Sequence, residues 1–237
     1  MYFSVYNRLR NIQDWLFPGN CLLCRARLPA GADLCPSCDA SLPRPEAACP
    51  RCAAPLASDA AGNCGACQQR PPAFDAAKAA FRYAAPVDRL IQDLKYHRRL
   101  TLARVLGRRL ADHVAACDVA LPDVIVPVPL HAVRLRERGY NQSLEIARVV
   151  SQQLKVPVSA HGAVERVRAT VSQTKLAPEA RARNVRNAFR ISGDFAGQCV
   201  ALVDDVMTSG HTAAALAKSL KHADASRVSV WVVARAG

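Results

Sequence analysis

Two adjacent carboxylates and a run of small hydroxyl residues lie close together in the last fifth of this 237-residue sequence. Asp204 and Asp205 follow a short apolar run, and the turn 206–212 (VMTSGHT) leads into an Ala-rich stretch. A strand that passes into a helix through such a turn offers unpaired N–H groups and hydroxyls to an anion. The paired acids suit ribose hydroxyls or Mg2+ beside that anion. An ordinary capped turn is the simpler interpretation, but two acids followed by T-S-G-x-T favour a phosphate site.

Eight of the ten cysteines form four CxxC pairs within residues 21–67. Each pair places two thiolates at one point, and two pairs complete a tetrahedral shell of four sulfurs around zinc. We therefore predict two structural zinc ions. Sequential pairing closes the shorter loops and is preferred, with interleaved pairing as the alternative. The predicted ligands of the two sites are Cys21, Cys24, Cys35 and Cys38, then Cys49, Cys52, Cys64 and Cys67.

Four thiolates around each zinc leave no open coordination position, so these metals are expected to fold the module and not to catalyse. The segment is rich in Pro, Ala and Gly and has little core of its own, so zinc is the expected source of its stability. Cys117 and Cys199 fall outside the pattern and are expected to be buried residues without a chemical role. Upstream, an apolar stripe at helical spacing (Val5, Leu9, Ile12, Leu16) predicts an N-terminal helix.

Charge and cysteine content divide the chain into two expected domains. Residues 1–75 carry 7 basic and 6 acidic side chains, whereas residues 76–237 carry 25 and 13. The segment Arg70-Pro71-Pro72 marks the expected join, because consecutive prolines stop regular structure. Two basic clusters, 89–109 and 165–190, are either solvated helix faces or the walls of one anion-binding cleft.

Strands alternate with helices in residues 76–237, which predicts an α/β fold with a mostly parallel sheet. Ligands bind at the carboxyl ends of such strands, where Asp204 and the proline-rich segment 126–131 both fall. Trp231 is expected in the core. The expected order is strand 80–83, helices 86–97 and 102–115, strand 124–128, a helix from after Asn141 to about 154, strands 163–167 and 200–203, a helix after Gly210, and strand 228–234.

Two segments carry a family resemblance. The stretch VALVDDVMTSGHT (200–212) resembles the 5-phosphoribosyl-1-pyrophosphate (PRPP) loop of type I phosphoribosyltransferases. The segment VPVPLH (126–131), with Arg134 and the run RGYNQ (138–142), is similar to the signature of the ComF/GntX competence-protein family. Further matches lie at 94–96, 168–173 and 181–189. That family joins an N-terminal zinc ribbon to a type I phosphoribosyltransferase domain of parallel strands flanked by helices.

The resemblance implies roles for single residues. Asp204 and Asp205 would be the catalytic acids that contact the ribose hydroxyls and the Mg2+-bound ligand, and Arg134 and Arg138 would bind pyrophosphate. Lys95, Arg99, Arg168 and Arg181 are weaker cationic candidates. The 5-phosphate would be held by Thr208, Ser209, Gly210, His211 and Thr212. Tyr140 either closes over the ligand or packs, and His131 either touches the ligand or is satisfied by the backbone.

The implied function is PRPP binding with Mg2+ and a role in natural competence and DNA uptake, with possible phosphoribosyl transfer to an unknown nitrogen acceptor. Purine salvage is not supported, because its carboxylate base would stand where this chain has Thr208. The alternative is a non-catalytic protein that binds single-stranded DNA in the basic cleft. A scaffold that docks a helicase-like partner is a third possibility. No apolar run approaches the roughly 18 residues of a membrane helix, and Arg8, Arg10 and Asp14 argue against a signal peptide, so a cytoplasmic location is expected.

Overall fold

The computed structural model describes residues 19–29, 31–57, 62–117, 119–168 and 188–237. The chain forms two compact units, residues 1–43 and residues 44–237. The division lies between the two cysteine groups, whereas the sequence suggested a join after residue 75. The second cysteine group therefore shares a unit with the sheet. The expected N-terminal helix lies outside the described residues.

The unit 1–43 is small in its described part. A two-residue strand β1 (Gly19–Asn20) pairs antiparallel with β2 (Arg27–Leu28), and one short helix, α2 (Pro36–Ala40), follows. The thiol of Cys35 caps α2 by accepting a hydrogen bond from the Cys38 N–H. The elements are the short knuckles that CxxC pairs produce, and Leu28, Leu34 and Leu42 are the buried aliphatic side chains of the described part of this unit.

The unit 44–237 is built on a parallel sheet of four strands in the order β3-β8-β7-β4. These strands are β3 (Ala76–Arg82), β4 (Val124–Pro127), β7 (Cys199–Met207) and β8 (Arg227–Arg235). Segment 157–159 continues the sheet beyond β4, since the Ile125 N–H donates to the Pro157 carbonyl and the Ser159 N–H donates to the Ile125 carbonyl. The parallel α/β fold expected from the sequence is confirmed.

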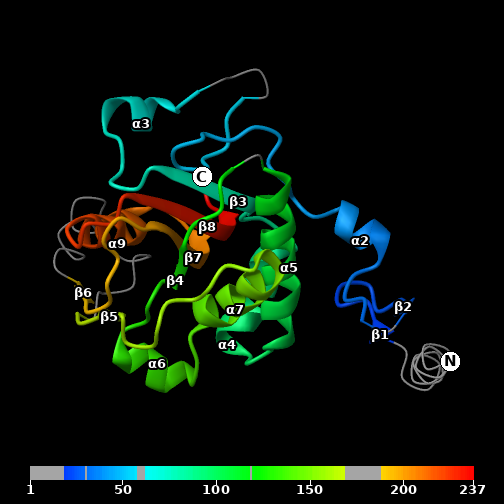
Figure 1. The fold of residues 1–237 in the computed structure, drawn as a ribbon. Coiled ribbons are helices and arrows are strands. Elements are labelled where there is room, and N and C mark those ends of the chain that lie inside the picture. Colours follow the sequence, from blue (N-terminus) through cyan, green and yellow to red (C-terminus); the bar gives the residue numbers. More distant parts are fainter. Residues whose placement is uncertain (1–18, 30, 58–61, 118, 169–187) are drawn as a thin grey trace, which may run out of the picture. The chain divides into compact units, whose positions relative to one another are not determined.

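Helices cover both faces of the sheet (Figure 1). The helices α4 (Val87–Tyr96), α5 (Thr101–Ala116) and α7 (Gln142–Leu154) lie on one face, and α9 (His211–Lys221) lies on the other. Core side chains such as Leu202, Leu216 and Val230 are fully buried, and Trp231 is also buried as expected. Each of these helices turns an apolar stripe to the protein interior, and α4 packs on α5.

The helices α5 and α7 approach closely at Gly107. A Cβ atom at that position would lie 2.8 Å from Cβ of Val149 and 3.2 Å from the carbonyl oxygen of Ile146. Because no side chain longer than hydrogen fits there, glycine sets the distance between the two helices.

Four short elements complete the described part of the unit. The helix α3 (Gly65–Gln69) belongs to the second cysteine group, and α6 (Ala132–Arg138) follows β4. The strands β5 (Val164–Arg166) and β6 (Phe189–Ile191) pair antiparallel with each other, apart from the main sheet. The sequence did not predict α6 or β6. Within the described ranges, every helix is too short or too polar to span a lipid bilayer.

Candidate functional site

The two acids lie at the carboxyl edge of the sheet, on the central strand β7. This strand extends to Met207, four residues beyond its expected end, so both acids belong to the ladder and Asp204 pairs with Val232. The turn after Met207 ends at Gly210, which has a φ of 75° and caps α9. This left-handed backbone favours glycine. The chain thus passes from strand to helix in one turn, as the sequence predicts, and the five residues 208–212 surround the start of α9.

Asp204 is held by a residue that the sequence analysis missed. The hydroxyl of Ser143 donates to Oδ1 of Asp204 at 2.7 Å, and the Asp205 N–H donates to the same oxygen at 2.9 Å. Ser143 is fully buried in the first turn of α7. Shielding from water and the neighbouring charge of Asp205 raise the pKa of Asp204 to about 7, although these hydrogen bonds act in the opposite direction.

Asp205 forms an ion pair with Lys95, the last cation of α4. The Lys95 Nζ lies 2.9 Å from Oδ2 of Asp205, whose side chain is only 4% exposed. This contact is an ion pair, and Oδ2 is a buried oxygen that receives no hydrogen bond from the described residues. Burial alone would lower the pKa of Lys95, but the charges of Asp205 and Asp204 outweigh it and raise the pKa. Lys95 was one of the weaker cationic candidates from the sequence, and the structure places it beside the acids.

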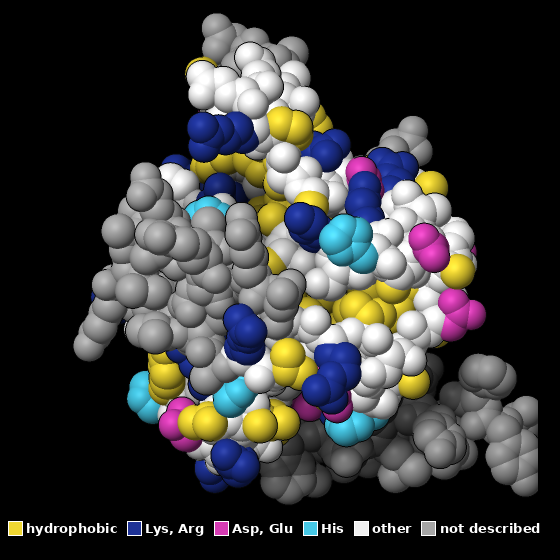
Figure 2. All heavy atoms as spheres, turned by 90° about the vertical axis from the view of Figure 1, so that its left-hand side faces the viewer, with side chains coloured by type: hydrophobic (Ala, Val, Ile, Leu, Met, Phe, Trp, Pro, Cys, Tyr) yellow, Lys and Arg dark blue, Asp and Glu magenta, His cyan; other side chains and the backbone are white. Residues whose placement is uncertain are grey.

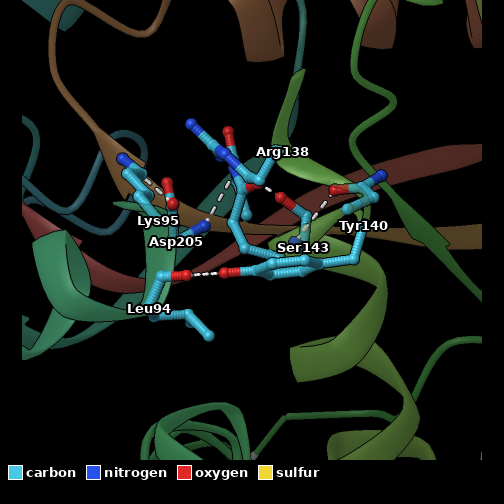
Figure 3. A network of polar contacts seen from close by, with 9 residues as sticks. Leu94, Lys95, Arg138, Tyr140, Ser143 and Asp205 are labelled. Carbon is cyan, nitrogen blue, oxygen red and sulfur yellow. Dashed lines mark hydrogen bonds and ion pairs between the residues drawn. The ribbon is translucent and has the colours of Figure 1, made fainter. Parts of the chain in front are cut away.

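The predicted arginines meet Lys95 in a hollow of about 240 Å3. Its wall contains four cationic side chains and one acid, Glu137, together with the exposed ring of Tyr96. Arg138 lines the hollow together with Lys95 (Figure 3), and its guanidinium lies 5.5 Å from the Tyr96 ring centre. Such a surplus of positive charge suits phosphate oxygens. The four cations are Lys95, Arg98, Arg134 and Arg138.

Structural roles account for Tyr140 and His131. The Tyr140 hydroxyl donates to the Leu94 carbonyl and so ties α7 to α4 (Figure 3). The Nδ1 of His131 accepts the Val133 N–H at 3.3 Å and caps α6. Asn141 caps α7 and also donates to the Val128 carbonyl at 3.0 Å, which fixes the segment after β4 beside the site. The run 138–142 thus positions the helices around the acids.

Other candidates lie away from this edge or outside the described residues. Arg99 pairs with Asp93 at 2.7 Å, and Arg181 lies outside the described residues with much of the basic cluster 165–190. On the face that carries α9, β5 and β6, the Lys and Arg side chains form several separate groups (Figure 2). Cys117 and Cys199 are half-buried, contrary to their expected burial, because both lie at the ends of elements.

The cysteines form two groups of four sulfurs in sequential order. Within each group all sulfurs lie within 4.8 Å of one another, which confirms the preferred pairing. The Cys24 and Cys35 sulfurs lie 3.7 Å apart, and those of Cys52 and Cys64 lie 3.6 Å apart. A tetrahedral shell with Zn–S bonds of about 2.3 Å spaces its sulfurs roughly 3.8 Å apart, so both groups fit zinc.

The comparisons with known proteins agree with this architecture. Residues 12–68 match the double zinc ribbon domain family, and residues 140–237 match the phosphoribosyl transferase domain family. The DNA utilization protein YhgH of Escherichia coli K12 is 37% identical over 92% of this chain and 97% of its own length. Competence protein F of Haemophilus influenzae is 34% identical over 73% of this chain and 79% of its own length. The chain therefore belongs to the ComF competence-protein family, in which a double zinc ribbon is joined to a phosphoribosyltransferase domain.

Proposed function

We propose that this chain binds PRPP with Mg2+ at the carboxyl edge of its sheet and transfers the phosphoribosyl group to a nitrogen nucleophile. The single observation that carries the proposal is the meeting of three features at one edge. These are the acid pair on β7, the glycine-capped start of α9, and the hollow lined by four cations. Their chemistry suits the ribose, the 5-phosphate and the pyrophosphate of PRPP, respectively.

The two acids take different tasks in this proposal. Asp204 is partly accessible and receives Ser143 on one oxygen only, so its other oxygen is available to a ribose hydroxyl or to Mg2+. Carboxylate oxygens are the ligands that Mg2+ prefers, so the donor set fits this ion. Asp205 is buried and paired with Lys95, and it holds that cation at the mouth of the hollow. Mg2+ would neutralise pyrophosphate charge as that group leaves.

The cationic residues of the hollow would stabilise the leaving pyrophosphate. The flat guanidinium groups of Arg134 and Arg138 suit paired phosphate oxygens. Thr208, Ser209 and Thr212 supply hydroxyls for the 5-phosphate beside the backbone N–H groups of the α9 start. Transfer forms a bond from the acceptor nitrogen to C1 of the ribose and breaks the C1–oxygen bond, whose electron pair leaves with pyrophosphate.

Calorimetry with PRPP and Mg2+ tests this site. The double variant Asp204→Asn with Asp205→Asn should bind PRPP at least tenfold more weakly than the unaltered chain. Asp194→Asn is the matched control, because Asp194 is an exposed acid on a loop of the same unit. Equal affinity in the double variant would overturn the assignment of the acids. Pyrophosphate release with a panel of nitrogen acceptors then tests turnover.

A second function, binding of single-stranded DNA, is favoured by one specific observation. The hollow combines four cations with Tyr96, a residue that is 70% exposed, and Arg138 lies over one face of its ring, so the other face would be the one on which a base stacks. Names of the relatives that refer to DNA utilization and competence accord with a role in DNA uptake. Affinity for a single-stranded oligonucleotide should fall steeply with salt, and PRPP should compete for the hollow. Absence of binding at low salt would exclude this function.

A further inference from the structure

The last residue of β8, Arg235, connects the second cysteine group to the end of the strand that carries the acids. Its Nε donates to the Cys52 carbonyl at 3.1 Å, and its Nη1 donates to the Met207 carbonyl at 3.2 Å. Met207 is the last residue of β7 and directly precedes the turn 208–210. One guanidinium thus bridges a cysteine knuckle and the start of the proposed phosphate loop.

The same two regions share a core. Ala53, Phe74 and Met207 are buried in one apolar cluster, and Cys52 packs against it. A Cβ atom at Gly210 would lie 3.6 Å from the Met207 sulfur and 3.9 Å from the Phe74 ring. The floor of the loop is therefore made of side chains that also contact the knuckle region.

Two further contacts fix the knuckle, one to the sheet and one to the segment before β3. The Ala77 N–H of β3 donates to the Pro50 carbonyl at 3.1 Å. The Arg51 guanidinium donates to the Pro72 carbonyl at 3.0 Å. Pro50, Arg51 and Cys52 are consecutive, so the turn between two sulfurs of the group is bonded to β3, to the segment before β3 and to β8.

We propose that Arg235 is a positioning residue through which the second cysteine group holds the loop 207–212 in its binding shape. The inference rests on the proposed function for what the loop binds, but the coupling itself is a property of the protein alone. Arginine suits the task because its planar group presents donors in two fixed directions. A Lys residue has a single ammonium at the end of a flexible chain and cannot reproduce both directions.

Hydrogen exchange in the absence of ligand tests the coupling. In Arg235→Met, the amides of Ala236 and Ala214, which donate to the carbonyls of Met207 and Gly210 at 3.0 Å and 2.8 Å, should exchange roughly ten- to a hundredfold faster, as loss of a hydrogen bond from a charged donor to the Met207 carbonyl allows. Arg227→Met is the matched control, because Arg227 is the exposed first residue of the same strand. Arg235→Lys should fall between the two. Zinc content should stay at two ions per chain in all three variants.

Two cysteine variants separate the groups. Cys64→Ser, in the second group, should lose one zinc and accelerate exchange at the amides of Ala214 and Ala236. Cys24→Ser, in the first group, should lose one zinc and leave exchange at these two amides unchanged. Unaltered exchange in both Arg235→Met and Cys64→Ser would overturn the proposal. If the loop responds but PRPP does not bind the unaltered chain, the proposed function fails and the coupling stands.

Discussion

The two cysteine groups have nearly the same spacing but different surroundings. In the first group Cys24 is exposed, and the helix α2 between its later ligands has no buried residue. In the second group Cys49 and Cys67 are buried, and the turn between the first two ligands is bonded to the sheet. Spacing identifies the metal ligands, but only the residues around them decide which body each metal stabilises.

The sharpest difference should appear when the chain is shortened. A chain of residues 44–237 should fold with one zinc, whereas a chain of residues 76–237 loses the second group and every contact it makes with the sheet. We expect the shorter chain to lose several kcal/mol of unfolding free energy, part of the roughly 10 kcal/mol that a structural zinc site contributes. Chemical denaturation with a zinc assay measures this. Equal unfolding free energies for chains 44–237 and 76–237 would mean that the second cysteine group does not stabilise the sheet and so does not differ from the first in this respect.

A charge change at the site should leave both zinc ions in place. Lys95→Met removes the partner of the buried Asp205 carboxylate, and such a loss costs roughly 3 kcal/mol of unfolding free energy. Thermal unfolding should show the loss, while the zinc content stays at two. Lys218→Met, on the solvent side of the last turn of α9, is the control that should behave like the unaltered chain. Loss of zinc from Lys95→Met would show that the ion pair at the site also stabilises a cysteine group.

Asp75, at the expected join between the modules, is bonded to both α9 and β8. Its carboxylate accepts from the Val228 N–H at 2.8 Å and from Lys221 Nζ at 2.7 Å. Burial opposes ionisation, but these partners outweigh it and lower the pKa of Asp75. Asp75→Ala should cost about 1–3 kcal/mol of unfolding free energy, because it leaves a backbone N–H without its partner.

This cost should depend on pH in a defined direction. The folded pKa of Asp75 lies below the unfolded value of 3.8, so its contribution is present above pH 3.8 and is lost as the pH falls through the folded pKa. The difference between the unaltered chain and Asp75→Ala should therefore shrink only in acid. A constant difference from pH 7 to pH 3 would contradict the ion pair with Lys221.

Ligand affinity should respond to pH near neutrality. The pKa of Asp204 is raised to about 7, so this carboxyl is mostly protonated below pH 7 and ionised above it. Affinity for PRPP with Mg2+ should rise up to tenfold per pH unit below 7 and level off above it. Calorimetry across pH 6 to 8 measures this, and Asp204→Asn should leave only the smaller dependence that comes from the second ionisation of the ligand's phosphate, at about pH 6. A flat profile in the unaltered chain would contradict a role for the ionised carboxyl.

Long or strongly patterned elements could be predicted from the sequence. The apolar strands, the Asn141 cap of α7 and the Gly210 turn carry local signals, and each lies within a few residues of its expected place. The helix α6 has no buried residue, so it has no apolar stripe to reveal it. The strand β6 has only three residues and pairs outside the main sheet.

Contacts between distant residues could not be predicted in this way. Ser143 and Asp204 are 61 positions apart, and nothing local marks which residue of the first turn of α7 faces β7. The ion pair of Lys95 with Asp205 depends on how α4 lies against the sheet edge. The boundary between the compact units depends on bonds from Pro50, Arg51 and Cys52 to residues that spacing does not reveal.

The close approach of α5 and α7 at Gly107 offers a way to disturb the acid pair on β7 through the helices that pack behind it. One added methyl group there would collide with Val149 and force α7 away from α5. The first turn of α7 supplies the hydroxyl that steadies Asp204, so the displacement would reach the acid without touching any residue of the hollow. Variants that impair this protein should therefore be sought along the interior helix seam as well as among the residues that meet the ligand.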